Sequence, residues 1–355
     1  MTMTEIFINQ TGRLRSGWRF LLFLLSVLFF ASLFGAVVRE IFLNLPIGFD
    51  ENSLLSFIYP NFILLTVSIF VGWLCGKFLE GLPFRALGCR FTKNWLKDLS
   101  FGLVIGAVSI LFAALVGIIF GGLSFQLNQT NGQSAILLTF GVSLVVFIIG
   151  AAAEETFFRG YMLQTFARAG DVIEKSHFRR FILQDFVQAK FAWLVIVFTF
   201  LAGIKLVWLA IAFTSLFFAS AHLGNPNANY ISVLNTALAG IWFGTAYLKT
   251  RNLWFVFGLH LTWNWVQGAF LGLPVSGITE LTTAPLFRVS EFGAKQITGG
   301  DYGIEGGISC TIAIIASTIL IWFLPFLKPT EEMLALTSKE IVLQKNEKPE
   351  KIFAS

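Results

Sequence analysis

The chain has 355 residues, of which 56% are hydrophobic and 13% are charged, whereas a soluble domain carries about 25% charged residues. Its formal net charge is +5, and the basic residues gather beside apolar segments, which indicates contact with anionic lipid and excludes nucleic-acid binding as their purpose. The composition therefore excludes an ordinary soluble globular protein and predicts a polytopic membrane protein.

Apolar segments of about 20 residues, long enough to cross a bilayer, recur along the sequence and predict an all-α fold of about eight transmembrane helices. They lie at Phe20–Val38, Ser53–Gly76, Ser100–Gly122, Ile136–Leu163, Phe191–His222, Tyr230–Leu248, Leu253–Gly272 and Gly307–Leu327. Met1–Arg19 precedes a segment without a small-residue cleavage site, so we expect a retained first helix rather than a signal peptide.

The sequence divides into three parts. Residues 1–135 carry about three N-terminal transmembrane helices, residues 136–273 carry the candidate catalytic helices, and residues 274–355 carry a loop, the last transmembrane helix and a solvated cytoplasmic tail. Basic residues are frequent before the first segment and in alternate loops. By the positive-inside rule both termini are predicted to be cytoplasmic. We expect an integral protein of a bacterial plasma or inner membrane.

Two adjacent glutamates, Glu154 and Glu155, end an uncharged stretch that begins at Leu99. An ionisable side chain at the centre of a membrane helix costs at least about 2.5–3.5 kcal/mol, so such residues are functional candidates. Glu155 and Arg159 lie four residues apart, which suits an intrahelical ion pair that supports the site. Glu154 points about 100° away from Glu155 and has no partner on its own helix. We therefore predict that Glu154 is the chemically active carboxylate.

Two of the three histidines lie in apolar segments. His222 ends the fifth segment, and His260 lies inside the seventh, with Asn264 one turn later on the same face. The third, His177, lies in a charged loop and is expected to be an ordinary loop residue. Three separate helices thus carry chemically useful side chains at membrane depth.

These side chains suit hydrolysis by an activated water in an intramembrane cavity. Glu154 and His222 can take a proton from water, while His260 and Asn264 can hold the oxyanion of a tetrahedral intermediate. The alternative is a divalent metal such as zinc, bound by Glu154, His222 and His260. Because Asn is a poor zinc ligand and no HExxH motif is present, a metal-free mechanism is slightly preferred.

Three motifs occur in order on successive apolar segments: Glu-Glu-x-x-x-Arg at Glu154–Arg159, Phe-x-x-x-His at Phe218–His222 and His-x-x-x-Asn at His260–Asn264. Together they resemble the CAAX protease and bacteriocin-processing (CPBP) family of intramembrane endopeptidases, which includes the type II CAAX prenyl endopeptidases and the bacterial Abi proteins. The resemblance covers about Ile136–Leu273. A looser similarity lies near the N-terminus, at Gly12–Arg19.

The resemblance implies an eight-helix membrane fold and endopeptidase activity in a cavity open to the membrane. It implies that Glu154 and His222 act on the nucleophilic water, and that His260 and Asn264 act on the oxyanion. The expected partners are the lipid bilayer and membrane-associated protein substrates, either prenylated or bearing a leader. The family has been described both as metalloproteases and as metal-independent glutamate proteases, so the resemblance leaves the metal requirement open.

The spacing between the first two motifs departs from the family. Sixty-two residues separate Arg159 from His222, and the extra material lies near Asp171–Gly203. The apolar run Phe191–His222 holds 32 residues, too many for one upright helix, and Lys205 interrupts it. It is either a long tilted helix or one that starts with an interfacial segment.

Two other functions fit parts of the pattern. Intramembrane Glu, His and Arg also line transporters and proton-coupled carriers, but no inverted repeat and no matched pair of broken helices is present. A family member without catalytic activity could act as a membrane scaffold, although its motifs would not then need to be intact. Phe218 alone is expected to serve packing, and Asn264 alone would suit a hydrogen bond between helices.

Overall fold

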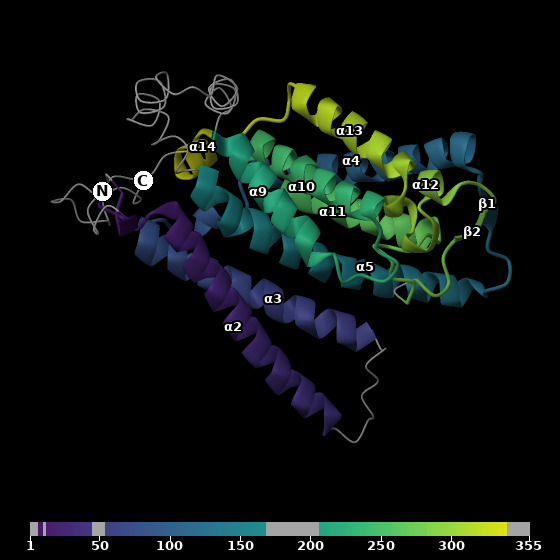
Figure 1. The fold of residues 1–355 in the computed structure, drawn as a ribbon, viewed down its shortest axis with the longest axis horizontal. Coiled ribbons are helices and arrows are strands. Elements are labelled where there is room, and N and C mark those ends of the chain that lie inside the picture. Colours follow the sequence, from purple (N-terminus) through teal and green to yellow (C-terminus); the bar gives the residue numbers. More distant parts are fainter. Residues whose placement is uncertain (1–5, 10–11, 45–53, 168–205, 281, 339–355) are drawn as a thin grey trace, which may run out of the picture.

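The computed structural model describes residues 6–9, 12–44, 54–167, 206–280 and 282–338. These residues are mainly helical. The helices are α2 (Ser16–Leu43), α3 (Leu54–Cys75), α4 (Trp95–Val116), α5 (Gln133–Glu155), α9 (Leu206–Ala221), α10 (Tyr230–Thr250), α11 (Leu253–Trp265), α12 (Lys295–Thr298), α13 (Ile308–Phe323) and α14 (Glu331–Ser338). Figure 1 shows α4, α5, α9, α10, α11 and α13 in one bundle, from which the pair α2 and α3 leans away.

The described helices match the predicted apolar segments. Five are long and apolar enough to cross a membrane: Ser16–Leu43, Leu55–Glu80, Trp95–Gly121, Gln133–Ala167 and Tyr230–Thr250. Two shorter apolar helices lie at Val207–Ala221 and Ile308–Phe323. The predicted all-α polytopic membrane fold is confirmed, while the count of eight spans stays a prediction. The insertion near 171–203, His177 and Lys205 lie outside the described residues.

Asparagine caps fix the starts of two helices that border the site. Asn229 accepts hydrogen bonds from the backbone of Ile231 and Ser232 at 2.9 and 3.0 Å, and the Ser232 hydroxyl accepts one from Asn229 N, which completes a capping box before α10. Asn252 caps α11 and donates 2.7 Å to Asp98 at the start of α4. The first turns of α10 and α11 therefore have little freedom to shift.

Glycine lets α4 and α11 approach almost backbone to backbone. A Cβ placed on Gly102 would lie 2.1 Å from Phe255 O, and one on Gly106 would lie 2.3 Å from Leu259 O. On the facing helix, a Cβ on Gly258 would lie 2.7 Å from a carbonyl oxygen of α4. Small residues four apart are a common device for packing helices in lipid, where no hydrophobic force drives the helices together. The packing of α11 on α4 therefore depends on these three glycines.

Several helices end in a wider turn with π-helical hydrogen bonding. One of these turns, Thr156–Met162, follows α5 directly and begins one residue after Glu155. Another, Val266–Phe270, continues α11 beyond Asn264. π-helical turns are frequent at functional sites. Regular α-helical geometry was expected at Glu154–Arg159, so the local helix type differs from the expectation.

A short two-stranded sheet joins two loops at one end of the bundle. Strand β1 (Leu123–Leu127) pairs antiparallel with β2 (Phe287–Glu291), and Leu123 lies opposite Glu291. The first strand belongs to the linker between α4 and α5, and the second to the loop between α11 and α13 (Figure 1). The predicted all-α fold did not include this sheet.

At the opposite end, α14 packs on the loop after α3. Its Met333 and Leu336 are buried against Leu82 and Ala86, and its Glu332 forms ion pairs with two arginines, Arg85 at 3.2 Å and Arg90. The C-terminal segment therefore begins with a docked helix rather than as the solvated tail that was expected. The N-terminal segment reaches the same end, because Arg19 pairs with Glu80 at 3.2 Å. Which side of the membrane this end faces stays a prediction.

Candidate active site

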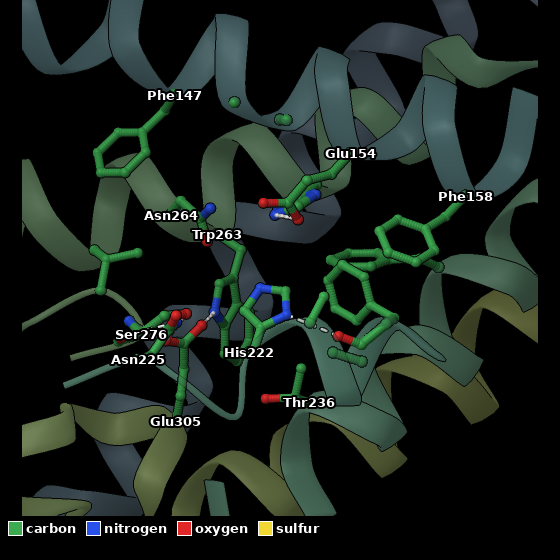
Figure 2. Close-up of a pocket in the computed structure, with 18 of the residues that line it drawn as sticks. Phe147, Glu154, Phe158, His222, Asn225, Thr236, Trp263, Asn264, Ser276 and Glu305 are labelled. Carbon is green, nitrogen blue, oxygen red and sulfur yellow. Dashed lines mark hydrogen bonds and ion pairs between the residues drawn. The ribbon is translucent and has the colours of Figure 1, made fainter. Parts of the chain in front are cut away.

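One cavity of about 400 Å³ brings the four predicted catalytic side chains together. Glu154 comes from the last turn of α5, His222 from the residue after α9, and His260 and Asn264 from α11. Figure 2 shows three of these side chains, Glu154, His222 and Asn264, around a common space. Apolar side chains of α2 and α3, among them Leu28, also line the cavity. It therefore reaches the helix pair that leans away from the bundle.

His260 lies between the two adjacent glutamates. Its Nδ1 is 2.8 Å from Glu155 Oε1, and its Nε2 is 3.8 Å from Glu154 Oε2. Since a carboxylate accepts, we assign the Nδ1 proton of His260 to the bond with Glu155. The second ring nitrogen then points toward Glu154 across a gap longer than a hydrogen bond. The imidazole also stacks on Phe243, with ring centroids 4.6 Å apart.

Glu155 has two partners rather than the one that the sequence indicated. Its Oε1 accepts from Arg159 Nη1 at 3.2 Å, four residues along the chain, as predicted. The same oxygen contacts His260, so Glu155 orients a predicted catalytic side chain besides neutralising Arg159. Spacing along one helix gave no sign of the second contact, which joins α5 to α11.

An aromatic cage surrounds the Arg159 guanidinium, which is 2% exposed. Its carbon lies 4.8 Å from the ring centroid of Phe218 and 5.2 Å from that of Phe243. One guanidinium nitrogen donates to Gly240 O at 3.4 Å. Cation–π contacts of this kind strengthen when the cation is removed from water. The side chain of Phe218 thus packs on a charge, which extends the packing role expected for it.

His222 is oriented by the end of its own helix. Its Nδ1 lies 2.8 Å from Phe218 O, one turn earlier. Because a carbonyl oxygen can only accept, the proton belongs on Nδ1 and the lone pair on Nε2 is left for other partners. The ring packs on Phe218 with centroids 4.6 Å apart. His222 therefore lines the cavity as a potential proton acceptor.

The remaining two predicted catalytic residues, Glu154 and Asn264, also line the cavity. Glu154 is 27% exposed, and its Oε2 is buried and accepts no hydrogen bond from the described part of the chain. Asn264 lines the same cavity one turn after His260. Its neighbour Trp265 donates 3.1 Å to Phe140 O of α5, which holds this turn of α11 against that helix. The carboxamide therefore stands on a helix that is fixed on two sides.

The metal alternative requires Glu154, His222 and His260 to converge on one ion. Among the described residues, no group of three His, Cys, Asp or Glu side chains stands close enough to hold a metal ion. His222 also uses Nδ1 to bond its own helix, so only its Nε2 could serve as a ligand. These donors are therefore not arranged as a preformed metal centre, and the metal requirement stays a prediction.

Sequence reasoning missed the second carboxylate of the cavity, Glu305. It precedes α13 and lines the same space as His222, together with Ser276 and Asn225 (Figure 2). The signal available in the sequence was an acidic residue in a glycine-rich turn, Tyr302-Gly-Ile-Glu-Gly-Gly, directly before the last apolar segment. From the sequence, Glu305 was assigned to a loop. Residue spacing cannot show that this loop folds over the cavity.

Comparison with known proteins agrees with the motifs. Residues 136–266 match the family described as type II CAAX prenyl endopeptidase Rce1-like. An uncharacterized protein, YyaK of Bacillus subtilis (strain 168), is 29% identical over 143 residues, which cover 39% of this chain and 46% of the relative. The match thus spans about half the length of that relative. No solved structure matches the chain.

The matched segment runs from the early part of α5 to the residue after α11, and it contains Glu154, His222, His260 and Asn264. The family predicted from the three motifs is therefore confirmed over this segment. Residues 136–266 of this integral membrane protein are thus similar to the Rce1-like, type II CAAX prenyl endopeptidase family.

Proposed function

We propose that this protein is an intramembrane endopeptidase that hydrolyses peptide bonds of membrane-associated proteins. The observation that carries the proposal is the cavity itself, in which a glutamate, two histidines and an asparagine from three elements face one space. The family match over residues 136–266 supports the same reaction class.

The hydrogen bonds of the two histidines suggest which side chain accepts a proton and which donates to the oxyanion. Neutral His222 donates Nδ1–H to its own helix, so its Nε2 can accept a proton from water, as can the Glu154 carboxylate. In its doubly protonated form, His260 donates Nδ1–H to Glu155 and has Nε2–H free for an oxyanion. Asn264 offers a second N–H donor. These donors lie on one helix, which suits stabilisation of charge that appears only in the transition state.

The reaction balances with water as the only co-substrate. Glu154, with His222, removes a proton from water as the oxygen attacks the scissile carbonyl carbon. The carbonyl oxygen becomes an oxyanion, which accepts hydrogen bonds from His260 and Asn264. When the intermediate collapses, the carbon–nitrogen bond breaks and Glu154 returns the proton to the leaving amine. The products are a new carboxylate and a new amine.

The lining of the cavity favours a substrate that arrives from the membrane. Leu28 of α2 and Phe57, Asn61 and Leu64 of α3 line it together with residues of the bundle. Leu28 is 50% exposed, and in an integral membrane protein such a surface meets lipid. A prenylated or leader-bearing protein held in the bilayer could therefore enter between these helices. We further propose that both termini are cytoplasmic, in the plasma membrane of a bacterium.

The experiment incubates the purified full chain in detergent with membrane-associated peptides in water enriched in ¹⁸O. We expect cleavage, one ¹⁸O atom in the new C-terminal carboxylate, and loss of both on Glu154→Gln. Parallel digestions with chelator and metal analysis of the purified protein test the zinc alternative. The protein could instead cleave no peptide and carry ions across reconstituted vesicles, with the flux abolished by Glu154→Gln. That outcome would favour a transporter over a protease. A folded protein with neither activity would favour a scaffold.

A further inference from the structure

The carboxylate of Glu305 is fixed at the wall of the cavity by both of its oxygens. Oε1 accepts from Trp263 Nε1 at 3.1 Å, and Oε2 accepts from Ser276 N at 2.6 Å and from Ser276 Oγ at 3.0 Å. Its backbone oxygen accepts from Asn235 Nδ2 at 2.8 Å. Hydrogen bonds to an ionised acceptor are worth roughly twice those between neutral groups. Glu305 is therefore held in one orientation by three elements.

All of these partners are neutral, whereas two other buried carboxylates, Glu80 and Glu155, each pair with an arginine. Glu80 pairs with Arg19 at 3.2 Å, and Glu155 pairs with Arg159 at the same distance. By contrast, no Lys, Arg or His nitrogen of the described residues forms an ion pair with Glu305. A carboxylate in a largely apolar cavity is less well solvated than one in bulk water, and a cation from a bound molecule would compensate its charge.

The surroundings of Glu305 leave it accessible to such a molecule. Its side chain is partly exposed, into the space that it shares with His222, Asn225 and Thr236. Figure 2 shows Glu305 and Ser276 beside His222, to its left, with Glu154 above. The cavity therefore has two carboxylates in its lining, one at the proposed catalytic water and one beside His222.

Resting on the proposed endopeptidase function, we propose that Glu305 is a specificity-determining residue that binds a positively charged side chain, Lys or Arg, of the substrate near the scissile bond. The fixed oxygens can accept from an ammonium or a guanidinium without rearrangement. A substrate carboxylate at the same place would meet like charge. The cavity thus favours internal cleavage beside a basic residue over a free C-terminus at this wall.

Glu305 also ties the loop at Ser276 to α11, so a loss of activity on substitution would not by itself show charge recognition. The test therefore uses the ratio of kcat/KM for a Lys peptide to kcat/KM for the matching norleucine peptide. Membrane-associated peptides that differ only in Lys or norleucine are compared at each position within a few residues of the cleavage site. We expect wild-type kcat/KM to favour Lys at one position by about tenfold or more, where tenfold corresponds to about 1.4 kcal/mol. Glu305→Gln should bring this ratio close to one.

Asp98→Asn is the matched control. Asp98 is a buried carboxylate that accepts from Asn252 and lies outside the lining of the cavity. This variant should keep the wild-type ratio. Equal losses for the Lys and norleucine peptides in Glu305→Gln, or no preference for Lys at any position in the wild type, would overturn the proposal and leave Glu305 a support for the loop.

A binding measurement separates this proposal from the catalytic one. Glu154→Gln and the double variant Glu154→Gln/Glu305→Gln are titrated with fluorescent Lys and norleucine peptides. We expect the single variant to bind the Lys peptide about tenfold more tightly and the double variant to bind both alike. This outcome would support Glu305 as a cation site even if the wild type cleaved nothing. Cleavage without any difference in affinity or in kcat/KM would refute the cation site alone.

Discussion

α2 and α11 are both apolar helices, yet they occupy opposite environments. Of the 28 residues of α2, only Arg19, Phe23 and Val27 are buried, whereas most of the 13 residues of α11 are buried. Apolar composition therefore does not tell which helix forms the core of a membrane protein. In lipid the apolar side chains gain little by leaving the membrane for the protein interior.

The polar contacts account for the difference. α11 bonds its neighbours through Asn252, His260, Thr262, Trp263 and Trp265, which reach α4, α5 and the loop before α13. On α2, by contrast, Arg19 forms an ion pair with Glu80 near the first turn. Polar groups and close glycine contacts thus locate the centre of this fold, and the same helix carries two of the proposed catalytic residues. The predictions below test that contrast, beginning with the largest expected effect.

Glu154→Gln should abolish activity while leaving the fold intact. The amide cannot take a proton from water, and loss of a general base typically lowers the rate by about 10²–10⁴-fold. Peptide cleavage measures the rate, and gel filtration in detergent measures the folded fraction. If the variant retained more than a tenth of wild-type kcat, Glu154 would not be the base.

Glu155→Ala should damage the fold. The change leaves Arg159 without its anionic partner in a site that is 2% exposed and removes the hydrogen-bond acceptor of His260. Breaking a buried pair in this way costs about 3–5 kcal/mol of unfolding free energy. Denaturant unfolding in detergent checks the value, with Glu155→Gln as the control that keeps one acceptor oxygen. An unfolding free energy equal to that of the wild type would show that the buried network is not needed for stability.

Asn264→Ala should slow turnover more than it weakens binding. An oxyanion donor acts mainly in the transition state, and removing one typically lowers kcat by about 10²–10³-fold. Steady-state kinetics would show a reduced kcat with KM nearly unchanged. A rise in KM at constant kcat would instead assign Asn264 to substrate binding.

Gly102→Ala should destabilise the bundle by a smaller amount. The added methyl would lie 2.1 Å from Phe255 O, so α4 and α11 must separate, and overpacking of this kind costs about 1–3 kcal/mol. Gly35→Ala on α2 is the matched control, because its methyl would meet nothing within 4 Å. The control should be stabilising by about 0.5–1 kcal/mol, as expected for alanine in a helix. Similar effects in both variants would remove the distinction between core and peripheral helix.

Much of the site could be predicted because membrane burial makes polar residues conspicuous. Glu154, His222, His260 and Asn264 stand out in apolar segments, and the structure gathers them around one cavity. Their catalytic roles and the metal requirement stay predictions. The contact of Glu155 with His260 could not be predicted, because helical spacing describes neighbours within α5 and not the rotation of α11 against it.

The loops were less predictable than the helices. The position of Glu305 depends on the turn at Ser276, which has a positive φ of 50°, and on hydrogen bonds from another helix. The docking of α14 depends on Met333 and Leu336, apolar residues that a composition rich in Lys and Glu concealed. The pairing of β1 with β2 joins segments more than 150 residues apart, a separation at which alternation of residue types gives no partner.

The glycine contact between α4 and α11 also bears on how the protein could be engineered. His260 and Asn264 stand on a helix that cannot be moved without rebuilding its neighbour, so this wall of the cavity offers little room for variation. Leu28, Phe57 and Leu64 belong to helices with larger exposed surfaces. A mutant library aimed at new substrates should therefore diversify the α2 and α3 side and leave the glycines and the polar residues of α11 as they are.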